Sequence, residues 1–287
     1  MTPTMDRKVL RKPNFLFIGA AKTGSSWLYY VMREHPEIYV PDIKDPYFFD
    51  RNYQRGTDWY LRLFDRAPDS AKAIGELSHD YLYSLDAPDR IKQDLPGVKL
   101  IVCLRNPMEH IISTYMQMAH AGMTRVPLDE AIRTVPELVD EPSYSHYLPA
   151  WLDRFDHAQI KIMLFDDLRA SPRGFATQVF DFLGVSTPDD IDYARVVNAA
   201  DFPRSYLVSK VVGRSAHTAR RLGLVTLVGR LKQNPIILRT LYRPVAPRER
   251  PKLGAAEWER LRPYFREEIR RVAKLIDRDL SRWEAAW

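Results

Sequence analysis

Short runs of consecutive apolar residues alternate with segments of helical periodicity over roughly the first two thirds of the chain. The apolar runs predict buried strands over residues 15–18, 38–40, 73–77, 100–104 and 160–165. Between them, apolar positions three and four residues apart predict helices over 25–34, 57–63, 88–93, 108–121, 126–138, 147–155 and 175–183. Strands that alternate with helices indicate an α/β fold, in which helices flank a central parallel sheet of about five strands.

The last third of the chain changes from this alternation to long helical patterns. Residues 207–241 are apolar and basic, and 257–287 have the spacing of a charged amphipathic closing helix. We therefore predict a flexible N-terminus over 1–13 and a single domain over 14–287, in which 206–253 form a basic helical lid or insertion.

The first candidate for chemistry joins a predicted strand to a predicted helix. Residues 15–26 read FLFIGAAKTGSS, so an apolar strand runs into a glycine, a lysine and three hydroxyl residues. The first N–H groups of a helix have no partner inside it and carry partial positive charge, and Lys22 adds a full charge. This arrangement favours phosphate binding over a plain strand–helix turn with a stray lysine. Because Lys22 precedes Gly24, the G-x-x-x-x-G-K-[ST] loop of nucleotide triphosphatases does not match.

A second motif follows another predicted strand. Arg105 stands at the end of the apolar run 100–104, where open α/β sheets bind ligands. Asn106 is a good N-cap and Pro107 suits the first turn of the helix that follows. Ser113 lies two turns along and can face the same cleft. A guanidinium matches a phosphate in shape and charge, so we interpret this motif as a second phosphate site rather than a capped surface helix.

Composition excludes several classes of protein. The charged fraction of 28% and the hydrophobic fraction of 45% are those of an ordinary globule. The single cysteine, Cys103, lies within an apolar run, which favours a core residue over a nucleophile and allows no internal disulfide. The amino terminus lacks the apolar region of a signal peptide, and no window approaches the length of a membrane span. We therefore expect a cytoplasmic protein.

The net charge of +6 is unevenly distributed. Residues 204–252 hold twelve Lys or Arg against one acid, a net charge of +11, which leaves −5 for the rest of the chain. Such a block can face nucleic acid, an anionic membrane, an acidic substrate or a nucleotide. Aromatic residues are not interleaved with it, so we expect no nucleic-acid partner. Peripheral membrane contact through 207–241 and a homo-oligomer interface both stay open.

Together the two motifs resemble those of the sulfotransferases that use 3′-phosphoadenosine 5′-phosphosulfate (PAPS), most strongly the Golgi glycosaminoglycan sulfotransferases and their bacterial relatives. The resemblance implies a P-loop-NTPase-like three-layer sandwich. It also implies that the first loop holds the 5′-phosphate and the leaving oxygen through Lys22, Thr23, Gly24, Ser25 and Ser26. The string R-N-P-x-E-x-x-x-S-x-Y is similar to the family's 3′-phosphate site, which implies that Arg105 and Ser113 grip that phosphate. Arg204 could add a second cation there.

The resemblance offers two candidates for the base that takes a proton from the acceptor. Asp45, in KDPYFFD, matches the glutamate of an acidic-x-x-Phe-Phe string that is the base of the glycosaminoglycan enzymes. His79, in ELSHDY, matches the histidine of the K-T-H string of cytosolic sulfotransferases. Leu77 stands where both groups have a lysine, and Lys44 could replace that charge. We favour Asp45, with His79 as base or as an acceptor-orienting partner, and Lys22 as the catalytic cation.

The function that the resemblance implies is transfer of a sulfuryl group from PAPS to a hydroxyl, with release of 3′-phosphoadenosine 5′-phosphate (PAP) and without a metal. The acceptor would be a carbohydrate, a lipid or another small molecule such as a polyketide. One alternative is a nucleotide or small-molecule kinase with a degenerate phosphate loop. A further one is a non-catalytic RNA- or membrane-binding protein built on the basic segment.

Overall fold

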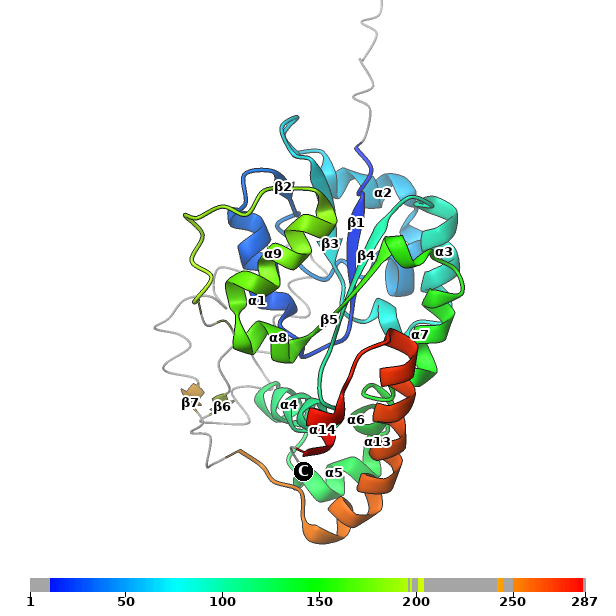
Figure 1. The fold of residues 1–287 in the computed structure, drawn as a ribbon, viewed down its shortest axis with the longest axis vertical. Helices are drawn as coiled ribbons and strands as arrows, with labels where there is room; N and C mark the ends of the chain where they lie inside the picture. The colour runs from blue at the N-terminus through cyan, green and yellow to red at the C-terminus, as the bar shows by residue number, and fades with distance from the viewer. Residues whose placement is uncertain (1–10, 196, 198–200, 204–241, 245–249, 286–287) are drawn as a thin grey trace, which may run out of the picture.

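The computed structural model describes residues 11–195, 197, 201–203, 242–244 and 250–285 (Figure 1). Three predictions lie outside the described residues in whole or in large part: the helix over 207–241, the lid over 206–253 and the site residue Arg204.

A five-stranded parallel sheet in the order β2-β3-β1-β4-β5 forms the centre of the fold (Figure 1). Its strands are β1 (Phe15–Gly19), β2 (Ile38–Tyr39), β3 (Ala73–Leu77), β4 (Lys99–Leu104) and β5 (Ile160–Leu164). In the register, Phe17 of β1 lies opposite Leu77 of β3 and Ile101 of β4. The predicted fold class is confirmed. Because all five strands run the same way, their carboxyl ends meet at one edge, and the loop after β1 lies between those after β3 and β4.

Helices cover both faces of the sheet and extend beyond its carboxyl edge (Figure 1). One face carries α1 (Ser25–Glu34), α8 (Phe165–Ala170) and α9 (Pro172–Leu183). The other carries α2 (Thr57–Leu61), α3 (Ala87–Asp94), α7 (Tyr144–Leu152) and α13 (Ala255–Ile276). Beyond the carboxyl edge lie α4 (Pro107–His120), α5 (Leu128–Thr134), α6 (Glu137–Asp140) and α14 (Ser281–Ala285). A separate antiparallel pair joins β6 (Asp201–Pro203) to β7 (Tyr242–Pro244).

Alternate residues of β1 feed two hydrophobic clusters, one on each side of the sheet. Leu16 and Ile18 belong to the cluster beneath α2, α3, α7 and α13, whereas Phe15 and Phe17 belong to the cluster beneath α1 and α9. All four side chains are buried. A strand that is apolar on both faces reads as a continuous hydrophobic run, which is why the sequence identified it. This packing holds β1, and the loop that follows it, in a fixed position.

Two predicted helices are each divided in the structure. The helix expected over 126–138 is split into α5 and α6 at Val135 and Pro136, because proline lacks an N–H and favours an extended residue before it. The closing helix expected over 257–287 ends at Ile276, where Asp277 adopts a left-handed φ of 49°, and resumes as α14.

The strand expected over 160–165 also needs a correction. It stops at Leu164, and Phe165 opens α8, a helix that the sequence reading missed. The helix has six residues, too few to show a helical period clearly. The first two, Phe165 and Asp166, lie at the carboxyl edge of the sheet and so belong to the surroundings of the site.

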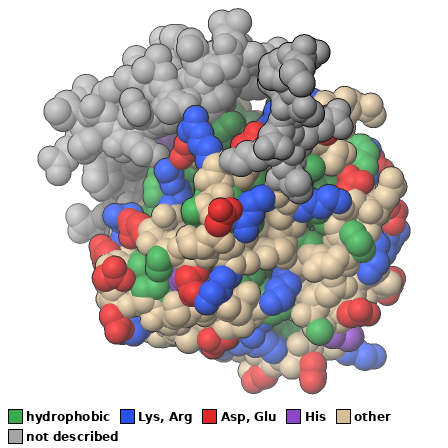
Figure 2. Space-filling view, turned by 90° about the horizontal axis from the view of Figure 1, so that it is seen from above, with side chains coloured by type: hydrophobic (Ala, Val, Ile, Leu, Met, Phe, Trp, Pro, Cys, Tyr) green, Lys and Arg blue, Asp and Glu red, His purple; other side chains and the backbone are tan. Residues whose placement is uncertain are grey.

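The surface seen from above mixes charges of both signs (Figure 2). Among the exposed pairs of the chain are Arg33 with Asp42 and Lys72 with Glu37. Where this view shows described residues, Lys and Arg are interspersed with Asp and Glu and do not gather into one basic patch. Among the helices that the structure describes, none has the length and apolar character that a membrane span requires.

Candidate active site

The loop between β1 and α1 turns tightly above the carboxyl edge of the sheet. Lys22 and Gly24 both have left-handed backbone angles, with φ of 61° and 93°. A Cβ atom on Gly24 would lie 2.5 Å from Leu168 Cδ2, so the turn requires glycine for its angle and for its closeness to α8. The buried Thr23 donates its hydroxyl hydrogen to Ala20 O at 2.7 Å and so braces the loop from inside.

The amino terminus of α1 opens out of this loop. Its first intrahelical bond runs from Leu28 N to Gly24 O at 3.0 Å, so the N–H groups of Ser25, Ser26 and Trp27 precede the helical ladder. The first turn contains no acidic residue. The backbone therefore presents unneutralised partial positive charge, as expected of an anion site. Trp27 packs into the core, where its indole donates to a backbone carbonyl.

Arg105 brings the second predicted motif against the first. It follows β4 directly, and its Nη1 donates to Lys22 O at 3.1 Å. Asn106 caps α4 by accepting from Met108 N at 3.0 Å, as predicted, and Pro107 lies in the first turn; the helix begins at Pro107, one residue before the predicted start. The hydroxyl of the buried Tyr144 donates to Arg105 O at 3.0 Å. The two motifs, far apart in sequence, thus share one site.

A carboxylate is held between two arginines in this second motif. Arg105 donates through Nε to Glu109 Oε2 at 3.0 Å, and Arg169 of α8 donates through Nη1 to Glu109 Oε1 at 2.9 Å. Both guanidinium groups lie over the Phe165 ring, 4.6 and 4.8 Å from its centroid. Ser113 is half-buried and lies four residues beyond Glu109, on the same side of α4. Neither Arg169 nor Phe165 was predicted as a site residue from the sequence, although both follow closely after the end of a predicted strand, where open α/β sheets bind ligands.

The two candidates for the base are in direct contact. His79 Nδ1 lies 2.8 Å from Asp45 Oδ1. Lys44 Nζ lies 2.9 and 2.8 Å from the two carboxylate oxygens of Asp45. The other ring nitrogen of His79, Nε2, lies 3.3 Å from Tyr47 Oη and 3.3 Å from Asp80 Oδ1. Residues that the sequence offered as rivals therefore form one hydrogen-bonded pair, with a lysine beside it.

Burial and neighbouring charges shift the pKa values of Lys22 and Asp45. Burial, followed by the positive charges of Arg105 and Lys44, lowers the pKa of Lys22 to about 8. Burial alone would raise the pKa of Asp45, but the hydrogen bond from His79 and the charges of His79 and Lys44 bring it below its usual value. Two further cations so close to Lys22 that they lower its pKa make this a site that favours an anion.

Lys44 lies close to the position where the resemblance implied a missing lysine, because the N–H of the next residue, Asp45, donates to Leu77 O at 3.0 Å. Leu77, which stands where the resemblance implied a lysine, is buried in β3 and its side chain packs in the core. Lys44 lies close enough to Lys22 to lower its pKa. The structure therefore supplies a second lysine to the site from a different loop.

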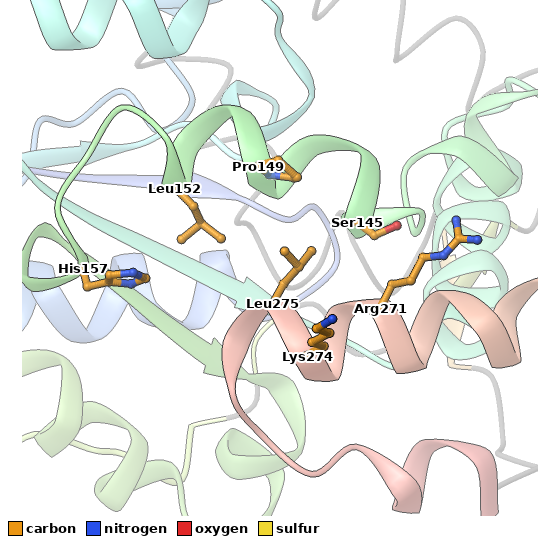
Figure 3. A pocket seen from close by; sticks show the side chains of 7 residues that line it. All are labelled: Ser145, Pro149, Leu152, His157, Arg271, Lys274 and Leu275. Atoms are coloured by element: carbon orange, nitrogen blue, oxygen red, sulfur yellow. The ribbon is translucent and has the colours of Figure 1, made fainter.

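A hollow of about 620 Å³ lies apart from these residues, between α7 and α13 (Figure 3). Leu152 and Leu275 point toward one another into it, and Arg271 and Lys274 stand along its α13 side. It shares no residue with the group around Lys22. Within the described ranges, no group of three or more His, Cys, Asp or Glu side chains is arranged to hold a metal ion. Independence from metal stays a prediction.

Comparison with known proteins decides the family. Residues 12–202 match the sequence model of the sulfotransferase domain, which covers most of the chain. This chain belongs to the sulfotransferase domain family. The predicted resemblance is therefore confirmed, and both phosphate motifs, the Asp45–His79 pair and Arg169 all lie within the matched range.

The chain is similar in sequence to several curated sulfotransferases. It is 32% identical to human heparan sulfate glucosamine 3-O-sulfotransferase 6 over 184 residues, 61% of this chain and 53% of that protein. It is 33% identical to the membrane-associated sulfotransferase kil1 of Dictyostelium discoideum over 113 residues, 39% of this chain and 24% of that protein. The chain thus spans about half the length, or less, of these curated relatives.

A solved structure supports the fold across nearly the whole chain. The sulfotransferase from Alicyclobacillus acidocaldarius superimposes with a TM-score of 0.70 and 23% identity, covering 95% of this chain and 99% of that one. At this identity the likeness concerns the fold.

Proposed function

We propose that this sulfotransferase moves a sulfuryl group from PAPS to the hydroxyl of a small-molecule or carbohydrate acceptor. The observation that carries the proposal is the convergence of Lys22 and Arg105. The guanidinium of Arg105 is hydrogen-bonded to the carbonyl of Lys22, while burial and the charges of Arg105 and Lys44 lower the pKa of Lys22. PAPS carries phosphate at both ends of one adenosine, which is the ligand that two adjacent anion motifs would suit.

The residues present fit that donor. The amino terminus of α1 and Lys22 would hold the 5′-phosphate, with Ser25 and Ser26 in the first helical turn. Arg105 and Ser113 would hold the 3′-phosphate. Thr23 would support the loop, because its hydroxyl hydrogen is already donated to Ala20 O.

The Asp45–His79 pair would take the proton of the acceptor hydroxyl. In this proposal His79 Nε2 accepts the proton, and Asp45 accepts a hydrogen bond from Nδ1–H and so keeps the ring in the productive tautomer. Lys22 and the helix terminus neutralise the charge left on the departing phosphate oxygen. Lys44, released from Asp45, would neutralise charge on the sulfuryl oxygens.

The acceptor is proposed at the level of chemical class. Relatives named for heparan sulfate glucosamine support a sugar hydroxyl, since the matched range includes both phosphate motifs and the pair of candidate bases. The apolar and basic pattern of residues 207–241 would suit a lipid or polyketide-like alcohol. A cytoplasmic location, membrane contact and a homo-oligomer stay predictions.

Calorimetric titration with PAP tests the donor. We expect wild-type protein to bind PAP, and Lys22→Ala and Arg105→Ala each to weaken binding by a factor of ten or more, because each removes a charge-assisted contact. Arg173→Gln is the matched control, since Arg173 is an exposed arginine of α9 paired with Asp189. Binding of ATP with magnesium in preference to PAP would favour a kinase, and PAP binding unchanged by both alanine variants would overturn the proposal.

A screen with radiolabelled PAPS then tests the acceptor. The probes are heparan sulfate oligosaccharides, simple glycosides and long-chain alcohols, each incubated with wild-type protein and with Lys22→Ala. Transfer of label to a hydroxyl by the wild type, but not by the variant, is the expected result.

A further inference from the structure

We infer that Arg169 is a second arginine of the 3′-phosphate site, and that the carboxylate of Glu109 occupies the place that this phosphate takes. This inference rests on the proposed function and adds a residue that the sequence motifs do not contain. The inference is based on an anion that already occupies this position: two guanidinium groups from different elements bind the Glu109 carboxylate at the carboxyl edge of the sheet.

The geometry is that of a two-arginine clamp. Arg105 directs Nε and Nη2 at Glu109 Oε2, each at 3.0 Å. Arg169 directs Nη1 at Oε1 at 2.9 Å and Nη2 at Oε2 at 2.7 Å. The Phe165 ring lies beneath both guanidinium groups and keeps them near one another. Clamps of this form recognise phosphate as well as carboxylate, since both present oxygens at matching spacing.

The charges favour exchange of the carboxylate for a phosphate. Two guanidinium groups face one carboxylate, so the cluster keeps a net positive charge that a phosphate dianion would neutralise. Although burial acts to raise it, the pKa of Glu109 is lowered by the hydrogen bond from Arg169 and by the charge of Arg105, so this carboxyl is an anion. Its side chain is 36% exposed and can turn toward solvent. Arg105 would stay in place meanwhile, because Nη1 is anchored on Lys22 O.

The competing explanation is a purely structural ion pair, in which Glu109 and Arg169 only connect α4 to α8. The two explanations differ in what they predict for ligands that differ by one phosphate. PAP and adenosine 5′-monophosphate (AMP) share the adenosine and the 5′-phosphate, so the ratio of their dissociation constants isolates the contribution of the 3′-phosphate.

The experiment measures this ratio by calorimetry for wild type, Arg169→Gln, Glu109→Gln and the control Arg173→Gln. We expect Arg169→Gln to weaken PAP about tenfold and to leave AMP unchanged, since one charge-assisted contact to the 3′-phosphate is lost. We expect Glu109→Gln to tighten PAP several-fold, because the competing anion is gone. The control should match wild type for both ligands.

Each outcome decides between the explanations. A PAP to AMP ratio that Arg169→Gln leaves unchanged overturns the inference, as does weaker PAP binding by Glu109→Gln. Failure of the wild-type protein to prefer PAP over AMP would instead count against the proposed function. AMP affinity serves as the internal check of folding. Equal loss of affinity for PAP and AMP in Arg169→Gln would indicate a purely structural role for Arg169 and would also overturn the inference.

Discussion

Asp45 and His79 form a single unit, although the sequence motifs presented them as candidates from two branches of one family. Asp45 has both carboxylate oxygens beside Lys44 and one of them beside His79 Nδ1. A carboxylate whose pKa is lowered by such neighbours is a weaker base. His79 keeps its second nitrogen directed at the polar groups of Tyr47 and Asp80. The geometry therefore supports His79 as the base and Asp45 as the residue that orients it.

This division of roles predicts different behaviour for two variants. With an acceptor identified by the PAPS screen, we expect His79→Ala to lower kcat by a factor of about 100 or more, since a general base contributes roughly that much. Added imidazole should restore part of the rate. Asp45→Asn should lower kcat and gain nothing from imidazole, because the base itself is present. If His79→Ala keeps near-normal turnover at saturating acceptor, Asp45 is the base.

Lys22 gives the site a pH dependence with a definite sign. The pKa of its ammonium is about 8 in the free protein, lowered first by burial and then by Arg105 and Lys44. A bound anion favours the charged form and raises that pKa. PAP affinity should therefore be constant below pH 8, and should fall by up to about tenfold per pH unit above it, as the free protein loses the proton.

Calorimetry between about pH 7 and pH 10 measures this decline. Lys22→Arg is the matched control, since a guanidinium stays charged throughout this range. Whatever its absolute affinity, its binding curve should be flat with pH. The same decline in Lys22→Arg would assign the titration to another group.

At the scale of elements, the strands and helices predicted most accurately are those marked by a local sequence pattern. The core strands read as apolar runs, and α1 was predicted with its observed bounds of Ser25–Glu34. Helix α4 was anticipated to within one residue at each end, because Asn106 and Pro107 mark a helix start by their own chemistry. These signals depend on residues only a few positions apart, so they can be recognised without knowledge of the fold.

What the sequence did not predict depends on contacts between distant segments. Helix α8 is short and begins directly at the end of β5, and its role in the site follows from Arg169 meeting Glu109 across 60 residues. The pairing of Asp45 with His79 spans 34 residues and needs the adjacency of the loops that follow the neighbouring parallel strands β2 and β3. Motifs identified the residues of the site, whereas the fold was needed to show which of them touch.

At the scale of the whole molecule, the C-terminal segment connects the two segments that carry Arg105 and Arg169, the end of β4 and helix α8. Trp283 of α14 is buried, and its Nε1 donates to Asp166 Oδ2 at 2.8 Å, beside the start of α8. Its backbone carbonyl accepts from Asn106 Nδ2 at 2.9 Å, beside Arg105. Arg278 adds a contact to Asp167 at 3.1 Å. One side chain and its backbone thus link the end of β4 to the end of β5.

Removing that link should affect stability and donor binding together. We expect Trp283→Ala to lower the free energy of unfolding by about 3–5 kcal/mol, since it leaves a large cavity and an unpaired Asp166. Trp283→Phe should cost only about 1–2 kcal/mol, because it fills most of the volume and loses one hydrogen bond to a charged group. Urea denaturation measures both values.

The link also makes a prediction for the folded variants. At urea concentrations too low to unfold the variant, we expect Trp283→Ala to lose more affinity for PAP than for AMP, each compared with wild type. The reason is that Asn106 and Asp166 adjoin the segments that hold Arg105 and Arg169, whereas neither hydrogen bond of Trp283 involves the loop after β1, which we propose as the 5′-phosphate site. Equal losses for the two ligands would mean that the C-terminal segment stabilises the fold without positioning the arginines. A selective loss would mean that Trp283 and its neighbours set the spacing of Arg105 and Arg169, the two arginines that we propose hold the 3′-phosphate.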